Sequence, residues 1–282
     1  MHKISDLSLR GSGSLPAELS SEQAGSGRAA EPGESTVGIR LSGIGKRFGD
    51  VVALRGIDFE IQRNSRVGIV GPSGGGKSTL LHIVAGLMEP DVGEVDVEGA
   101  TTAKDRLTRC AMMPQRDLLL PWRTALDNAI IALENRGVSR SQARAQTRPY
   151  FERFGLAKFE HFRPAQLSGG MRQRVSFMRT LVAEKDVLLL DEPFGALDSI
   201  TRAQMQEWLL RALGALPRTV LLVTHDVEEA LLLSKTVVVM SARPGRVVRT
   251  LTADFPTTAS RREIVTSREF VEVKEQALEA IG

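Results

Sequence analysis

The 282-residue sequence has few of the features that mark secreted or membrane-spanning proteins. It contains one cysteine, Cys110, which excludes an internal disulfide and suits a reducing compartment. Its apolar runs, such as residues 220–223, fall far short of the ~18 residues of a spanning helix. The N-terminus lacks the charged-then-apolar order of a secretory signal. The net charge of +3 is too small an excess to indicate nucleic-acid binding. We therefore expect a cytoplasmic protein in which Cys110 is a small core residue rather than a nucleophile.

The first 36 residues differ in composition from the rest of the chain. They are rich in Ser, Gly and Glu and poor in aromatic residues, so we expect residues 1–36 to be a disordered tail. From Val37 on, residues 38–44 and 57–61 alternate between apolar and polar, which predicts antiparallel strands. Residues 187–190 and 220–223 are continuous apolar runs, which indicate strands buried on both faces of a parallel sheet. The pattern therefore predicts an α/β fold.

A largely helical stretch over about residues 117–164 interrupts the α/β pattern. Within it, Pro149 falls inside a helix expected over residues 139–154 and should break or kink that helix. Beyond residue 250 we expect a loop and an amphipathic helix over residues 267–281.

The most informative stretch is glycine-rich and lies between an apolar run (67–70) and a helical pattern that begins near residue 80. It matches GxxxxGK[ST], whose backbone N–H groups converge on phosphate oxygens at a helix N-terminus. We expect the Lys77 amino group to reach the β- and γ-phosphates and the Ser78 hydroxyl to be a Mg²⁺ ligand. The expected nucleoside-triphosphate site comprises Gly71, Pro72, Ser73, Gly74, Gly75, Gly76, Lys77, Ser78 and Thr79.

Two carboxylates follow the apolar run 187–190. A carboxylate at the end of a buried strand beside a phosphate loop is placed to hold Mg²⁺, so we assign Asp191 to the metal, through water. Glu192, one residue on, is the predicted general base toward the attacking water. The alternative for both is a solvent-facing strand end.

A further glycine-containing motif, a serine followed by two glycines, lies within residues 167–171. Ser168 can cap a helix that begins near Gly169, which presents free N–H groups to an anion. A capping turn alone would also explain Ser168, Gly169 and Gly170.

With these motifs in place, residues 38–250 resemble the nucleotide-binding subunit of ATP-binding cassette (ABC) transporters. Residues 71–78 match the Walker A loop, 187–192 the Walker B strand and 167–171 the LSGGQ-type signature, with Met171 in place of the final Gln. The resemblance also assigns Gln115 to the Q-loop, residues 196–198 to the D-loop and His225 to the switch histidine. Phe48 matches the aromatic residue that stacks on adenine.

The resemblance implies a P-loop NTPase core, a mainly parallel sheet flanked by helices. To this core it adds an antiparallel β subdomain and an inserted α-helical signature subdomain. We expect the ATPase domain over residues 37–250, its helical subdomain over about 117–170, and a C-terminal loop and helix over 251–282.

For several residues the sequence also allows a simpler structural interpretation. His225 is read as a γ-phosphate contact or as a structural histidine, and Gln115 as a metal- and water-linked residue or as one without a role. Phe48 either stacks on adenine or belongs to the core. The arginines spaced four apart (Arg140, Arg144 and Arg148) form a solvated helix face or one attracted to anionic lipid. The apolar stretch 118–122 is either buried or a partner site.

The family pairs two copies head to tail, so that Ser168, Gly169 and Gly170 of one copy face the ATP bound by the other. The resemblance further implies ATP and Mg²⁺ as cofactors, a separate membrane permease and an extracytoplasmic substrate-binding protein. It places the chain as a peripheral subunit at the cytoplasmic face of the inner membrane.

One phosphate loop, no spanning helix and no coiled-coil insertion favour an importer subunit over other cassette proteins, with a soluble non-transport ABC ATPase as the alternative. Residues 120–128 and 241–247 look like the nitrate/sulfonate/taurine branch. That branch also includes importers of thiamine pyrimidine precursors and other small organic compounds.

Overall fold

The computed structural model describes residues 36–195, 197–214, 217–256 and 259–282. The chain divides into a unit of residues 1–35 and a unit of residues 36–282, and every described residue belongs to the second. The predicted tail therefore lies outside the described residues except for Thr36, as does Ala196 of the predicted D-loop.

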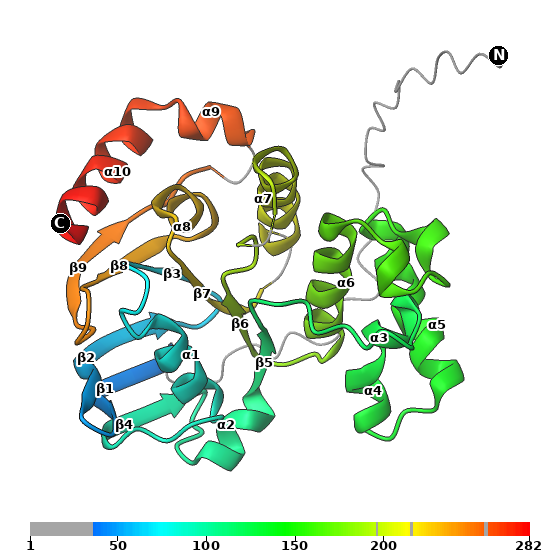
Figure 1. Cartoon of the computed structure of the whole chain (residues 1–282), viewed down its shortest axis with the longest axis horizontal. Helices are drawn as coiled ribbons and strands as arrows, with labels where there is room; N and C mark the ends of the chain where they lie inside the picture. Colours follow the sequence, from blue (N-terminus) through cyan, green and yellow to red (C-terminus); the bar gives the residue numbers. More distant parts are fainter. Residues whose placement is uncertain (1–35, 196, 215–216, 257–258) are drawn as a thin grey trace. The chain divides into compact units, whose positions relative to one another are not determined.

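A six-stranded sheet forms the centre of the described unit, in the order β5-β6-β7-β3-β8-β9 (Figure 1). Neighbouring strands from β5 to β8 are parallel, and β9 pairs antiparallel with β8. The strands are β3 (Arg66–Val70), β5 (Cys110–Met113), β6 (Val187–Asp191), β7 (Thr219–Thr224), β8 (Thr236–Met240) and β9 (Val247–Thr252).

The continuous apolar runs of β6 and β7 supply both faces of this sheet. Leu188 and Leu190 belong to one hydrophobic cluster, whereas Val187 and Leu189 belong to another on the opposite face. Because side chains alternate across a strand, a strand covered on both sides needs apolar residues at every position. The predicted burial of these runs is confirmed.

One face of the large sheet is covered by α1 (Lys77–Ala85) and by a three-stranded antiparallel sheet in the order β2-β1-β4. Its strands are β1 (Val37–Phe48), β2 (Val51–Gln62) and β4 (Val92–Val97). The predicted antiparallel pairing runs from Val37 opposite Gln62 to Phe48 opposite Val51. Helix α2 (Ala103–Arg109) follows β4 and packs on α1.

The other face carries most of the helices, with α3–α6 gathered beyond the β5 edge (Figure 1). They are α3 (Ala125–Ala129), α4 (Ile131–Asn135), α5 (Arg140–Arg153), α6 (Gly169–Val182), α7 (Ser199–Gly214), α8 (Val227–Leu233), α9 (Arg261–Val265) and α10 (Arg268–Ile281), with short 3₁₀ turns at Ala157–Phe159 and Pro164–Gln166. The expected C-terminal helix is therefore present, and the predicted α/β class with its antiparallel and helical additions is confirmed.

Of the break or kink predicted at Pro149, the break is wrong, because α5 is continuous from Arg140 to Arg153; the kink stays a prediction. A proline removes one N–H bond from the helix ladder. Tertiary packing outweighs this loss, since Ala143, Thr147 and Phe151 are fully buried on one face of the helix.

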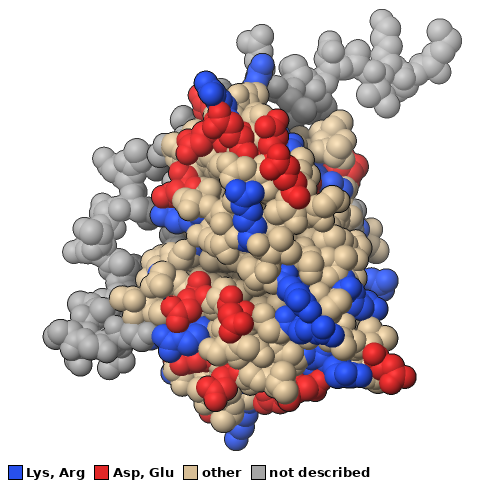
Figure 2. All heavy atoms as spheres, turned by 90° about the vertical axis from the view of Figure 1, so that its left-hand side faces the viewer, with Lys and Arg blue, Asp and Glu red and all other residues tan. Residues whose placement is uncertain are grey.

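None of the helices in the described part of the chain is long and apolar enough to cross a membrane. On the side of the molecule at the left of Figure 1, acidic and basic side chains share one surface (Figure 2). This mixture agrees with the small net charge.

Candidate functional site

The predicted phosphate loop joins β3 to α1, in the strand–loop–helix order that the motif requires. Gly76 is the N-cap of α1 at φ 85°, and a Cβ there would lie 2.6 Å from Leu54 Cδ2. A Cβ on Gly71 would lie 2.4 Å from the Met240 carbonyl oxygen. Only glycine fits such positions, so the loop follows the surrounding backbone closely.

The Lys77 side chain folds back over this loop. Its Nζ donates to the carbonyl oxygens of Gly71 at 2.8 Å and Pro72 at 2.9 Å. Burial lowers the pKa of Lys77, while the charges of Glu192 and Asp191 oppose that shift. The cation therefore has carbonyl partners but no ion pair within the described residues, which leaves its charge available to an anion.

Ser78 and Asp191 lie together at the start of α1 and the end of β6. The Ser78 hydroxyl donates to Asp191 Oδ1 at 3.0 Å. Burial raises the pKa of Asp191, and the bond from Ser78 opposes the rise. No group of three or more His, Cys, Asp or Glu residues among the described positions could hold a metal alone. One carboxylate and one hydroxyl fit Mg²⁺ that takes its remaining ligands from phosphates and water.

Three predicted catalytic residues lie together, because Glu192 contacts both Gln115 and His225. Gln115 Nε2 donates to Glu192 Oε2 at 2.8 Å, and His225 Nδ1 lies 3.2 Å from Glu192 Oε1. Glu192 has φ 42°, and its backbone N–H donates to the Val223 carbonyl at 2.8 Å. A non-glycine residue in this left-handed conformation is held there by its surroundings, as is common at functional sites.

A cavity of about 540 Å³ is lined by Gln115 and Glu192, whereas His225 is not among its described lining residues. Its described lining consists of Phe48, Val51, Ala53, Ser73, Gly74, Gly76, Lys77, Ser78, Thr79, Gln115, Glu192 and Arg243. Phe48 is 47% exposed at the cavity wall, so it is not a core residue. Its ring also lies 5.9 Å from Lys46 Nζ.

Sequence reasoning missed Val51, Ala53 and Arg243 as cavity residues. Val51 and Ala53 lie on β2, and Arg243 follows β8. The only available signal was the pairing of β1 with β2, which places Val51 opposite Phe48. Nothing in the sequence indicates that residue 243 lies beside the phosphate loop.

The predicted signature residues lie apart from this lining. Ser168 is the N-cap of α6, and its side chain accepts a hydrogen bond from the Met171 N–H at 3.3 Å. Among the described residues that line the cavity, Ser168, Gly169 and Gly170 do not occur. This arrangement agrees with the expectation that both motifs of one chain do not share one nucleotide.

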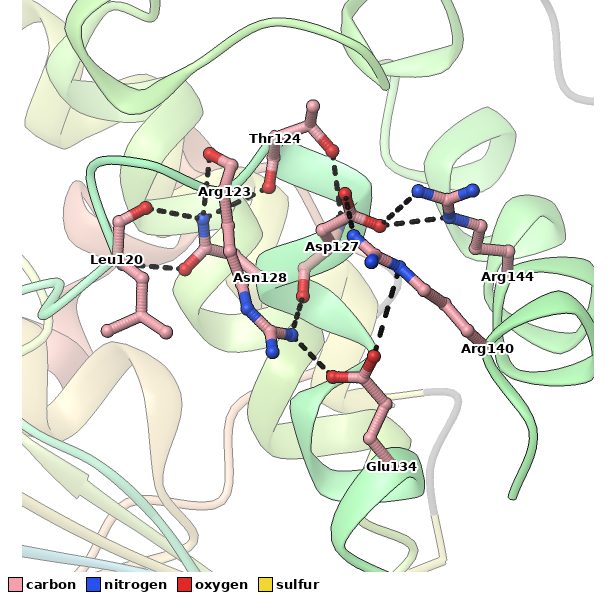
Figure 3. A network of polar contacts seen from close by, with 8 residues as sticks. All are labelled: Leu120, Arg123, Thr124, Asp127, Asn128, Glu134, Arg140 and Arg144. Atoms are coloured by element: carbon pink, nitrogen blue, oxygen red, sulfur yellow. Dashed lines mark hydrogen bonds and ion pairs between the residues drawn. The ribbon is translucent and has the colours of Figure 1, made fainter. Parts of the chain in front are cut away.

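The apolar stretch 118–122 is exposed at Leu118, Pro121 and Trp122. Leu118 and Trp122 are 59% and 69% exposed, whereas Leu119 is buried. The Asn128 side chain shapes this segment, because its Oδ1 accepts from the Leu120 N–H at 2.7 Å and its Nδ2 donates to the Leu120 carbonyl at 3.1 Å (Figure 3). We call Leu118 and Trp122 the apolar patch.

An ionic network supports the same segment from α3 and α5 (Figure 3). Arg140 Nη2 and Arg144 Nη2 each lie 2.7 Å from the buried carboxylate of Asp127, while Arg123 pairs with Glu134. Burial alone would raise the pKa of Asp127, but the bonds from Arg140 and Arg144 bring it below its ordinary value.

The arginines spaced four apart stay 40–55% exposed to solvent, but each of them is ion-paired. Arg140 and Arg144 share Asp127, and Arg148 Nε lies 3.1 Å from Glu160 Oε2. The carboxylates come from other elements, which the spacing of the arginines does not reveal.

The signature helix α6 is tied to the start of the apolar patch. Arg172 Nε donates to Asp117 Oδ2 at 3.0 Å, and Arg179 donates to the carbonyls of Asp117 at 2.8 Å and Leu118 at 2.9 Å. Helix α6 also packs extensively on α3. Leu118 of the patch and the signature residues are therefore both tied to α6.

A buried acid, Glu229, contacts Thr224, the residue before the predicted switch histidine. Glu229 of α8 is 3% exposed, and its Oε2 accepts a hydrogen bond from the Thr224 hydroxyl at 3.1 Å. Its Oε1 has no hydrogen-bond partner within the described part of the chain. Burial, with a smaller contribution from Asp226, raises the pKa of Glu229 from 4.5 to about 8.

We expect Glu229→Gln to remove a pH dependence of stability. The folded protein binds a proton that the unfolded chain releases above pH 4.5. The wild-type protein therefore loses stability as the pH rises toward about 8, by up to ~1.4 kcal/mol per pH unit. The substituted amide is neutral throughout, so the variant should exceed the wild type in free energy of unfolding at high pH and converge with it at low pH. Urea unfolding across this range, with exposed Glu275→Gln as control, measures the difference; parallel pH profiles would contradict it.

The fold and the cavity define a phosphate-loop nucleotide-binding protein, and comparisons with known proteins narrow the class. Residues 54–195 match the family described as ABC transporter. The chain belongs to this family, as an ATP-hydrolysing subunit.

Curated relatives and solved structures support the assignment. The chain is 49% identical over 210 residues to aliphatic sulfonates import ATP-binding protein SsuB 1 of Rhodococcus jostii (strain RHA1), covering 74% of this chain and 82% of that protein. It is 41% identical over 235 residues to taurine import ATP-binding protein TauB of Rhizobium johnstonii, covering 82% and 89%. A dimeric, post-hydrolysis structure of the ATP-binding cassette MJ0796 with ADP and Pi matches with a TM-score of 0.67 at 28% identity, covering 77% of this chain and 100% of that one.

Proposed function

We propose that this protein is the ATPase subunit of an importer for a small sulfonate such as taurine or an alkanesulfonate. The observation that carries the ATPase role is the position of Gln115 and Glu192 in the lining of the phosphate-loop cavity, with His225 in contact with Glu192. The substrate class is supported by the names of the relatives, which import sulfonates or taurine.

In the proposed mechanism the loop residues 71–79 bind the phosphates and Lys77 contributes the main positive charge. Phe48 holds the adenine ring. Ser78 and Asp191, with Gln115, would hold Mg²⁺, which supplies charge neutralisation on the phosphates. Glu192 orients the water and accepts its proton, while His225 and Gln115 hold the Glu192 carboxylate and face the γ-phosphate.

Ser168, Gly169 and Gly170 are proposed to complete the site of a second copy. Their separation from the cavity of their own chain supports this view, as does the dimeric state of the MJ0796 cassette. Two copies related by a two-fold axis would form two identical sites at once. ATP then favours the paired state through differential affinity, and hydrolysis removes that preference.

The proposed partners are a membrane permease at the cytoplasmic face of the inner membrane and an extracytoplasmic substrate-binding protein. The exposed apolar patch supports a contact with the permease, since an exposed tryptophan in the same short segment as a second exposed apolar residue is typical of an interface anchor.

We expect Trp122→Glu to weaken association with the permease by at least about 30-fold, because the loss of an aromatic anchor costs about 2 kcal/mol or more. Its ATPase rate as an isolated subunit should stay near that of the wild type. Co-purification with the permease measures the effect, and Leu87→Glu, which changes an exposed leucine outside the patch, is the control. Equal recovery of permease with both variants would overturn the assignment of the patch.

Uptake in native cells tests the function itself. We compare cells that carry the wild-type chain with cells that carry Lys77→Ala or the exposed-residue control Lys104→Ala. Each strain is given labelled taurine, an alkanesulfonate, nitrate or a thiamine pyrimidine precursor. We expect only Lys77→Ala to lose uptake, and only of taurine or the alkanesulfonate. Loss of nitrate or precursor uptake alone would replace the substrate class. Survival of all four uptakes would overturn the proposed function.

A further inference from the structure

The loop between β8 and β9, residues 241–246, is packed against the phosphate loop. A Cβ on Gly75 would lie 2.7 Å from the Ser241 carbonyl oxygen, and one on Gly245 would lie 2.1 Å from the Gly75 carbonyl oxygen. The two backbones are therefore in direct contact. Strand order explains the proximity, because β8 pairs with β3, which leads into the phosphate loop.

The same loop is braced from two further directions. The Gly245 N–H donates to the Ala53 carbonyl at 2.9 Å, and the Arg55 N–H donates to the Gly245 carbonyl at 3.0 Å. Within the loop, Ser241 Oγ accepts from the Arg246 N–H at 3.1 Å. The loop is thus held between the phosphate loop and β2, the strand that carries Val51 and Ala53 on the cavity wall.

Arg243 extends from this braced loop into the cavity lining. Its Nε donates to the Gly74 carbonyl at 3.3 Å. Arg243 forms no ion pair with any carboxylate of the described residues, whereas Arg123, Arg140, Arg144, Arg148 and Arg172 all do. The guanidinium has five N–H donors, so one bond to Gly74 leaves others free.

The charged side chains that line the cavity indicate what Arg243 binds. The described lining contains two cations, Lys77 and Arg243, and one carboxylate, Glu192. Lys77 Nζ is already bonded to two loop carbonyls. A planar guanidinium matches phosphate oxygens in a bidentate manner that an ammonium cannot provide.

We propose that Arg243 binds the polyphosphate of the nucleotide and raises the selectivity of the site for ATP over nucleotides with fewer phosphates. The inference rests on the proposed function, since it assumes that the cavity takes ATP. Residues 241–247, which the sequence singled out only for their resemblance to one importer branch, then contribute directly to the nucleotide site.

Equilibrium binding of fluorescent ATP, ADP and AMP analogues tests the proposal without a need for turnover. We expect Arg243→Ala to weaken ATP binding about tenfold or more, ADP binding less and AMP binding little, because each phosphate adds charge for the guanidinium. Arg243→Lys should recover part of the ATP affinity. Arg246→Ala, in the same loop but outside the described cavity lining, is the matched control and should bind all three as the wild type does.

Two results of the binding experiment would overturn the inference. An Arg243→Ala protein with wild-type ATP affinity overturns the inference. Equal weakening of ATP, ADP and AMP also overturns it, because that result would show a bracing role on Gly74 rather than a phosphate contact. Thermal unfolding of each variant shows whether it is still folded. If Arg243→Ala has lost its fold, Arg243→Lys is compared with the wild type instead. If the wild-type chain itself does not bind ATP, the proposed function fails rather than this inference.

Discussion

Glu192→Gln should reduce ATP turnover by a factor of about 10² to 10⁴ while leaving ATP binding intact, since general-base catalysis contributes about that much. The amide keeps the size of the side chain and can still contact Gln115 and His225, but it cannot accept a proton. With hydrolysis blocked, ATP should hold two copies together. Steady-state phosphate release measures the rate, and size-exclusion chromatography with and without ATP measures the dimer.

Glu184→Gln provides a matched control for this experiment. Glu184 also has a positive φ, of 52°, but it pairs with Arg136 outside the described cavity lining. Its variant should hydrolyse ATP as the wild type does. A Glu192→Gln protein that turns over ATP near the wild-type rate would show that Glu192 is not the base, even if it contacts the nucleotide.

Lys77→Ala should lose ATP affinity by about 100-fold or more, because it removes the charged donor from a partly desolvated phosphate site. The Gly71 and Pro72 carbonyls also lose their Lys77 partner, so the loop itself should become less ordered. Isothermal titration with ATP measures affinity, and Lys104→Ala controls for the loss of one lysine charge. Unchanged ATP binding by Lys77→Ala would contradict the role assigned to this lysine.

The parts of the fold that the sequence predicts are those with local signals. Residues 187–190 and 220–223 indicate buried parallel strands because both sheet faces demand apolar side chains. The order of strand, glycine loop and Lys77 indicates a phosphate site because few other structures require it. The grouping of Gln115, Glu192 and His225 agrees with the motif order, although their contacts come from three separate segments.

The missed features depend on contacts between distant elements. Arg243 reaches the cavity only because β8 lies next to β3, and chain order does not reveal this strand order. Asp127 forms ion pairs with Arg140 and Arg144, but it lies on another helix. Local propensity predicts a break or kink at Pro149, whereas burial of Phe151 and its neighbours keeps α5 continuous.

The ties from Arg172 and Arg179 to residues 117 and 118 have a mechanical consequence. Ser168 lies at the N-terminus of the helix that carries both arginines. A stiff helix transmits a displacement along its length, so we expect a shift of the loop near Leu118 to move Ser168 as well. Helix α6 would then couple a displacement of the loop near Leu118 to the distance between Ser168 and the γ-phosphate that Ser168 is proposed to face in a second copy.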